Sequence, residues 1–136
     1  MTKDRGVRLI IAGDQNIVFN GIMYGKPKTI AEARNLLSQM RGSEEVYAYT
    51  GNAVLLAENG KILQSINITD VARLSVDNIS DEEMDNYLSD GTCLSICGGI
   101  SINNALFVHL KEGRLSTAKG MTLEYAKEMM SNLAER

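Results

Sequence analysis

Hydrophobic and polar positions change period several times along the chain, which predicts alternating strands and helices. Val7 to Ala12 is a short apolar run with β-branched residues, typical of a buried strand. Two longer runs, Val46 to Ala57 and Lys61 to Val76, flank Asn59-Gly60, which is a strong two-residue hairpin signal. The pattern therefore predicts an antiparallel ribbon that is unusually long for a chain of 136 residues.

Three further segments have the spacing of amphipathic helices. The first starts at Thr29, which forms a capping box with Glu32, and the second at Ser80, which forms one with Glu83. Thr122 is expected to cap the third. The expected apolar stripes are Ile30, Ala33, Leu37 and Met40 in the first helix, and Leu123, Ala126, Met130 and Leu133 in the last.

One more strand is expected within Ile100 to Leu110, after the pair Gly98-Gly99. The order of elements then reads strand, helix, hairpin, helix, strand, helix. This order predicts a mixed α/β (α+β) fold in which a sheet with a long antiparallel hairpin is flanked by helices. At 136 residues the chain is expected to be a single domain, residues 1–136, with a core of its own.

Composition narrows the possible partners. With 14 basic and 17 acidic residues the net charge is −3, which argues against a broad nucleic-acid or membrane-surface footprint. No apolar run approaches the roughly 20 residues of a membrane span, and no signal peptide is recognisable, so a cytoplasmic location is expected. Cys93 and Cys97 lack zinc or redox spacing and are expected to be small buried hydrophobes.

Candidate chemistry lies in two short runs. Asp14 follows the first apolar run, so it is expected at the end of a strand, where it could hold Mg²⁺ or Mn²⁺ or orient a water. A turn aspartate that accepts local N–H bonds is the simpler alternative. Lys26, between Gly25 and Pro27, could balance phosphate charge or could be a solvated loop lysine. His109, within an apolar run, is expected to be a structural strand residue.

The order of these segments resembles the Maf-like family, also called septum formation inhibitor proteins. Gly13-Asp14-Gln15-Asn16-Ile17 is similar to the family's Ala-Asp-Thr-Val-Val, and Gly25-Lys26-Pro27 to its Gly-Lys-Pro. Thr50-Gly51 is similar to its Thr-Gly before the hairpin turn. Near the C-terminal end of the family's sequence, its motif Ala-Gly-Gly-Tyr-x-Ile-Gln-Gly is similar to Cys97-Gly98-Gly99-Ile100-Ser101-Ile102-Asn103-Asn104. The resemblance runs from about Val7 to Arg136.

This resemblance implies a Maf/ITPase-like fold and a nucleoside triphosphate pyrophosphatase, a hydrolase of nucleotide metabolism that forms a monophosphate and pyrophosphate. Asp14 would be the catalytic carboxylate and the ligand of a divalent metal, Mg²⁺ or Mn²⁺, and Lys26 would neutralise the triphosphate. Gln15 and Asn103 stand where the family carries residues that help select the substrate. The implied partner is a nucleoside triphosphate, not a nucleic-acid polymer or a membrane.

The family's Ser-x-Ser-Pro-Arg-Arg segment, and a later acidic residue and lysine, have no counterpart before the strand that begins near Val7. The resemblance thus implies an N-terminally truncated or degenerate member that lacks a substrate-binding segment and has reduced activity. A homo-oligomer, or a partner chain that completes the site, is expected. The alternative is a catalytically inactive Maf-like module that binds a nucleotide or a protein.

Overall fold

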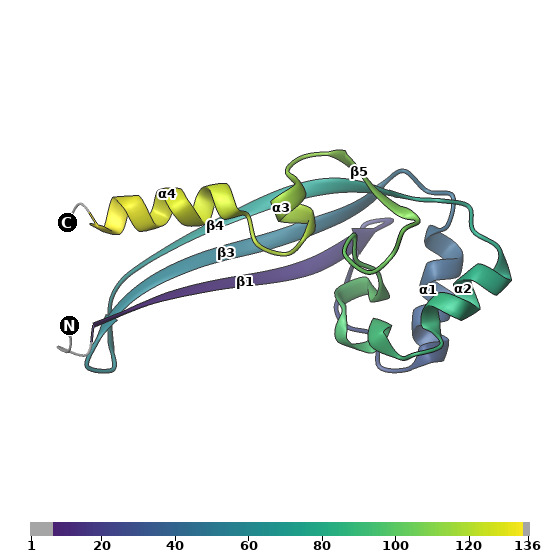
Figure 1. Cartoon of the computed structure of the whole chain (residues 1–136), viewed down its shortest axis with the longest axis horizontal. Coiled ribbons are helices and arrows are strands. Elements are labelled where there is room, and N and C mark those ends of the chain that lie inside the picture. The colour runs from purple at the N-terminus through teal and green to yellow at the C-terminus, as the bar shows by residue number, and fades with distance from the viewer. Residues whose placement is uncertain (1–6, 135–136) are drawn as a thin grey trace.

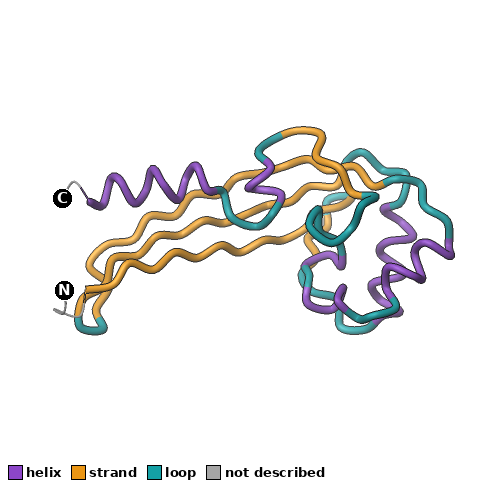
Figure 2. The backbone as a smooth tube through the Cα atoms, viewed as in Figure 1, coloured by secondary structure: helices purple, strands orange, loops and turns teal. Residues whose placement is uncertain are grey.

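The computed structural model describes residues 7–134, which form a five-stranded antiparallel sheet with helices along its length (Figures 1 and 2). The strand order is β2-β1-β3-β4-β5. The strands are β1 (Val7–Phe19), β2 (Ile22–Tyr24), β3 (Val46–Glu58), β4 (Lys61–Val76) and β5 (Val108–Glu112). The long hairpin of β3 and β4 is confirmed, as is the mixed α/β fold class.

The turn of the long hairpin is formed by the two residues that the sequence indicates. Asn59 and Gly60 both have positive φ, at 51° and 81°. This is the backbone that a two-residue hairpin needs to match the twist of its strands, and asparagine and glycine adopt it at low cost. Figure 1 shows the hairpin extending far beyond the helices α1 and α2.

The helices of the described segment are α1 (Ile30–Met40), α2 (Asp81–Leu88), α3 (Leu115–Ala118) and α4 (Leu123–Ala134), with short 3₁₀ turns η2 (Thr92–Ser95) and η3 (Cys97–Gly99). Ser80 and Glu83 form a complete capping box at α2. At α1, Thr29 Oγ1 accepts a hydrogen bond from the backbone N–H of Glu32 at 3.1 Å. No helix among residues 7–134 is long and apolar enough to cross a membrane.

The helices cover one face of the sheet. Along β3 the buried residues alternate, and Val46, Ala48 and Val54 point toward this face. The main cluster joins Val46 and Ala48 to α1, α2 and α3, and a smaller cluster packs Met129 of α4 against Val54. The opposite face of the hairpin has no helix packed against it in these clusters, and we call it the open face. The apolar side chains expected at positions 123, 126, 130 and 133 of α4 lie outside the described side chains.

Strand β1 differs from the expectation in length and in burial. It continues to Phe19, so Asp14 lies within the strand and not at its end. The run predicted to be buried is instead exposed: Leu9, Ile10 and Ile11 have exposed fractions of 47%, 45% and 40%. These residues are exposed because β3 pairs with one edge of β1 along its whole length, whereas β2 pairs with the other edge only at Ile17–Phe19.

The strand predicted within Ile100 to Leu110 is also largely wrong. Only Val108–Glu112 pairs with β4, and the preceding segment turns, with N–H groups of Asn104 and Ala105 donating to the Ser101 carbonyl. Ile100 and Ala105 are buried in the main core cluster without forming a strand, whereas Leu106 is 98% exposed. An apolar run alone does not separate a strand from a buried loop.

Candidate functional site

Asp14 lies on the open face of the sheet, directly opposite Gly51 of β3. Because Gly51 has no side chain, a depression of about 300 Å³ opens beside the exposed Asp14 carboxylate. Its floor is formed by β1, β3 and β4, and its lining residues include Ala12, Asp14, Gly51, Ala53, Asn67 and Thr69. The site is therefore shallow and reachable from solvent.

Lys26 follows β2, in a turn that is fixed to β1 through η3. The backbone N–H of Gly98 donates to the carbonyl of Gly25 at 2.8 Å. Gly98 has a φ of +70°, and a Cβ at this position would lie 2.7 Å from the Cβ of Ile17. Only glycine fits between β1 and the Gly-Lys-Pro turn at this distance. The sequence therefore fixes the turn that carries Lys26 against the strand that carries Asp14.

The electrostatics of Cys97 link the two candidate residues. Burial raises the pKa of the Cys97 thiol, the nearby Asp14 carboxylate raises it further, and the Lys26 ammonium lowers it. The half-buried thiol thus lies within the electrostatic fields of both charged groups. The strand of Asp14 and the turn of Lys26 are thus joined through η3, and the charges of both residues act on the same thiol.

Lys26 lines a second depression, of about 290 Å³. It is lined by the turn after β2 and by α1, which contributes Glu32, Asn35, Leu36 and Gln39. Lys26 and the polar side chains of this helix, Glu32, Asn35 and Gln39, together offer hydrogen-bond donors and acceptors in one groove. Asp14 thus lines one depression and Lys26 lines the other.

Gln15 points to the helix-covered face, away from Asp14, because successive residues of a strand alternate. Its side-chain Nε2 donates to the carbonyls of Thr117 at 3.0 Å and Ala118 at 3.1 Å, and lies 3.3 Å from Thr50 Oγ1. Thr50 Oγ1 also donates to the Thr117 carbonyl at 2.8 Å. Gln15 therefore anchors β1 and β3 to α3.

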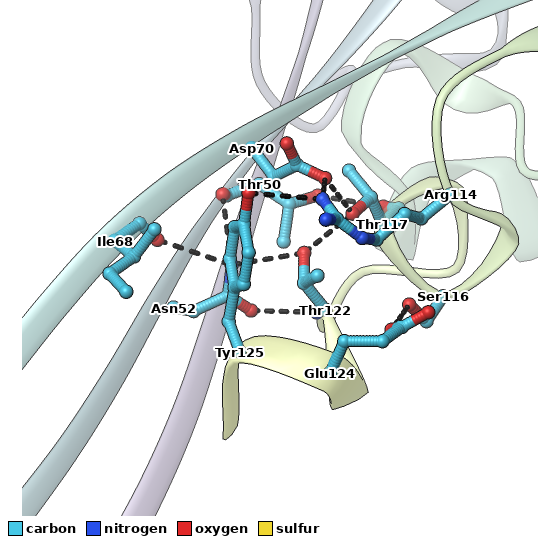
Figure 3. Close-up of polar contacts among 10 residues, drawn as sticks. All are labelled: Thr50, Asn52, Ile68, Asp70, Arg114, Ser116, Thr117, Thr122, Glu124 and Tyr125. Atoms are coloured by element: carbon cyan, nitrogen blue, oxygen red, sulfur yellow. Dashed lines mark hydrogen bonds and ion pairs between the residues drawn. The ribbon is translucent and has the colours of Figure 1, made fainter. Parts of the chain in front are cut away.

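The same face carries a buried polar network between the hairpin and α3–α4 (Figure 3). Asn52 accepts from the Thr122 backbone N–H at 2.7 Å, and its Nδ2 donates to Thr122 Oγ1 at 3.1 Å and to the Ile68 carbonyl at 3.2 Å. The hydroxyls of Thr117 and Thr122 lie 2.5 Å apart. Every buried side-chain polar atom of the described residues has a partner. The network is therefore fully satisfied and has a structural role.

Asp70 closes one side of the network. Burial raises the pKa of its carboxyl, but hydrogen bonds from Thr117 Oγ1 at 2.6 Å and Arg114 Nη1 at 3.1 Å outweigh burial and hold the pKa below its ordinary value. The Arg114 guanidinium also lies 4.5 Å from the centre of the Tyr125 ring, a cation–π distance. Asp70 Oδ2 thus accepts two hydrogen bonds within the protein.

The other candidate residues lie apart from Asp14 and Lys26. Asn103 is exposed in the turn before β5, where its N–H donates to Ser101 Oγ at 3.1 Å, and no hydrogen bond within residues 7–134 joins it to the two charged residues. His109 lies in β5 as expected and is 3.0 Å from the exposed Asp77. Cys93 is buried as expected, whereas Cys97 is only half-buried.

Asp14 could bind a divalent metal as a single carboxylate ligand, with the other ligands supplied by water and substrate. Among the described residues no group of three or more His, Cys, Asp or Glu side chains could enclose an ion. Mg²⁺, however, is commonly held by one or two carboxylates together with water and substrate phosphates. An exposed single carboxylate such as Asp14 suits an ion that arrives already bound to a polyphosphate.

The local motifs did not reveal Cys97 as a neighbour of the charged pair, nor the polar network. Cys97 lies 83 positions after Asp14 in the printed sequence, and Gln15 contacts Thr117 across a separation of 102 residues. One signal was present: Thr50 and Asn52 are polar at two positions where the alternation of β3 calls for core residues. Polar residues on a buried face indicate a hydrogen-bonded partner.

Comparison with known proteins gives consistent matches. A family model described as "Maf-like protein" matches residues 2–133. A nucleoside triphosphate pyrophosphatase of Mycobacterium leprae is 28% identical over 90% of this chain and 58% of its own length. A dTTP/UTP pyrophosphatase of Shouchella clausii is 31% identical over 85% and 58%. A 7-methyl-GTP pyrophosphatase of Dictyostelium discoideum is 30% identical over 93% and 63%. The chain thus spans less than two thirds of these relatives.

Proposed function

We propose that this chain, which belongs to the Maf-like protein family, contributes to hydrolysis of nucleoside triphosphates to a monophosphate and pyrophosphate. The names of the pyrophosphatase relatives support the substrate class and the reaction. The observation that carries the proposal is that Gly98 holds the turn of Lys26 against β1, the strand of Asp14. The charges of both residues also act on the neighbouring Cys97 thiol, which supports one shared site.

In the proposed reaction a water molecule attacks the α-phosphorus and the bond from that phosphorus to the bridging oxygen breaks, so pyrophosphate leaves. Asp14 orients the attacking water and accepts its proton, or holds the metal that binds the phosphates. Lys26 offsets the negative charge that gathers on the leaving pyrophosphate. A bound Mg²⁺ or Mn²⁺ would supply further charge neutralisation.

We propose that Asn103 and Gln15 contribute to substrate selection, although no hydrogen bond among the described residues joins either side chain to Asp14 or Lys26. Asn103 is exposed and is proposed to contact the nucleotide base. We propose that Gln15 acts on substrate binding indirectly, through the adjacent Asp14. The side-chain amide of Gln15 donates hydrogen bonds to α3 and so fixes the position of the strand that carries Asp14. A homo-oligomer or a partner chain is further proposed to bring additional positive charge to the triphosphate.

The experiment that tests this function measures pyrophosphate release from a panel of canonical and modified nucleoside triphosphates, with Mg²⁺ and with Mn²⁺. Asp14→Ala is expected to lower kcat about a hundredfold or more, because a positioned base or metal ligand is lost. Lys26→Ala is expected to lower kcat/KM by on the order of tenfold or more. Two exposed matched controls, Glu45→Ala and Lys61→Ala, are expected to retain wild-type kinetics.

Turnover that persists in Asp14→Ala would contradict the assignment of this residue. A folded wild-type chain that binds triphosphates but releases no pyrophosphate under any of these conditions would contradict hydrolysis by the chain alone. That outcome would favour the alternative, a Maf-like module that binds nucleotides without cleaving them.

A further inference from the structure

The outer edge of β1 has a long stretch without a strand partner. β3 pairs with β1 from Val7 to Phe19, but on the other edge β2 covers only Ile17–Phe19. Within the described part of the chain, no strand pairs with this edge from Val7 to Asn16. Unpaired backbone N–H and C=O groups of such an edge are a template for pairing with another strand.

The side chains along this edge also favour pairing. Leu9, Ile10 and Ile11 are each at least 40% exposed, and as consecutive strand residues they expose apolar surface on both faces. The pairing of β1 with β3 continues without a bulge, and the segment has no proline. The usual features that protect an edge are therefore missing, apart from the charges of Arg8 and Asp14 near its two ends.

We propose that two copies of this chain pair through the β1 edge, antiparallel, about a two-fold axis at Ile11. The free edge runs from Val7 to Asn16, so its midpoint lies between Ile11 and Ala12, and charge pairing selects Ile11 as the centre. In this register position i lies opposite position 22 − i of the partner. Ile11 then lies opposite its own copy.

Charge and size are both complementary in this register. Arg8 lies opposite the partner's Asp14, and by symmetry Asp14 lies opposite the partner's Arg8, so two oppositely charged pairs form. Large residues lie opposite small ones: Leu9 faces the partner's Gly13, and Ile10 faces the partner's Ala12. A shift by two positions would lose both charge pairs.

The outer edge of β4 is a poorer candidate. It is also unpaired before Arg73, where β5 begins, but polar residues alternate along it. Lys61 and Asp70 lie at its ends, but the Asp70 carboxylate already accepts hydrogen bonds from Thr117 and Arg114. It is therefore not free to pair with Lys61 of a second copy. The β1 edge is therefore the self-complementary one.

Pairing through β1 has a consequence for the candidate site, which rests on the function proposed above. Arg8 and Asp14 lie on the same open face, since their positions differ by six. The Arg8 side chain of the partner subunit would therefore lie beside Asp14, at the depression next to Gly51. Each site would gain a guanidinium, which binds phosphate oxygens well, from the other copy.

Sedimentation velocity of the whole chain over a concentration series tests this pairing without any activity measurement. We expect a dimer. Arg8→Glu and Ile11→Lys should each raise its dissociation constant by on the order of tenfold or more, because they place like charges opposite or next to each other. The double variant Arg8→Glu with Asp14→Arg restores both charge pairs and should recover the dimer. Ile62→Lys, at an exposed apolar position of β4 away from the proposed edge, is the control.

A cysteine at the axis tests the register. Ile11→Cys, in a Cys97→Ser background, should be joined to its own copy by a short thiol-specific reagent, whereas Ile62→Cys should not. A monomer at all concentrations would overturn the proposal and leave the edge to a strand of another polypeptide. A dimer that is insensitive to Arg8→Glu and Ile11→Lys, or is broken by Ile62→Lys, would overturn it too. Failure of the pyrophosphatase assay would leave these results untouched.

Discussion

At the scale of single residues, Asp14 is accessible because of the residue opposite it. Gly51 leaves the depression beside the carboxylate open, and a Cβ at this position would meet only the Asp14 carbonyl oxygen, at an ordinary 3.8 Å. Glycine is not needed there for a positive φ, since Gly51 lies in regular strand. Gly51 is therefore not required by the backbone conformation, and its small size instead leaves space beside the Asp14 carboxylate.

Gly51→Val is accordingly expected to fold and to fill the depression. Because valine suits a strand, the thermal midpoint should stay close to that of the wild type. The kcat/KM for triphosphate hydrolysis should fall by on the order of tenfold or more, since the phosphates can no longer approach Asp14. Unchanged kinetics in a variant with a normal melting transition would show that the depression is not used.

Asp70 gives the protein a dependence of stability on pH. Its folded-state pKa is held below 3.8 by Thr117 and Arg114, against the effect of burial. The stabilisation is therefore present above the unfolded-state pKa, and is lost as the pH falls from about 4 through the lower, folded-state pKa. We expect the free energy of unfolding of Asp70→Asn to decline less steeply below pH 4 than that of the wild type, in urea titrations. Parallel declines would contradict this assignment.

At the scale of elements, local signals predicted what depends on neighbours in sequence. The Asn59-Gly60 turn, the Ser80 capping box and both hairpin strands are confirmed because each depends on adjacent residues. The short helix α3 and the limited length of β5 were not predictable in this way. α3 is held by contacts with Gln15 and Thr50, which lie far away along the chain.

The polar network predicts how the C-terminal helices are held. Asn52→Leu would leave the buried Thr122 N–H without its acceptor and lose the bonds of Nδ2. Each unsatisfied buried group costs about 1–3 kcal/mol, so the free energy of unfolding should fall by at least that much. The exposed Asn67→Leu, on the open face of the same hairpin, should change it by no more than about 0.5 kcal/mol. Chemical denaturation measures both.

Hydrogen exchange would locate the effect of Asn52→Leu. The backbone amides of α4 should lose protection before those of β3 and β4, because Thr122 joins the start of α4 to the hairpin. Uniform loss of protection across the whole sheet would contradict the view that the network acts as a local attachment.

At the scale of the whole molecule, the sequence predicted the candidate residues better than their surroundings. Asp14 and Lys26 were recognisable because each lies in a short run with an abrupt change of chemistry. The exposure of β1 was not recognisable, because an apolar run reads the same whether a further strand covers it or not. The open edge beside Asp14 is thus a property of the assembled sheet, and it is where a second copy would complete both the sheet and the site.

We propose that Asp14 and Lys26 form one site that cleaves between the α- and β-phosphates. Chromatographic analysis of the products from a nucleoside triphosphate with Mg²⁺ tests it most directly. We expect one nucleoside monophosphate and one pyrophosphate for each triphosphate consumed, and about a hundredfold less of both products with Asp14→Asn at equal protein concentration. Formation of a diphosphate with inorganic phosphate, or the same products at an undiminished rate from Asp14→Asn, would contradict it.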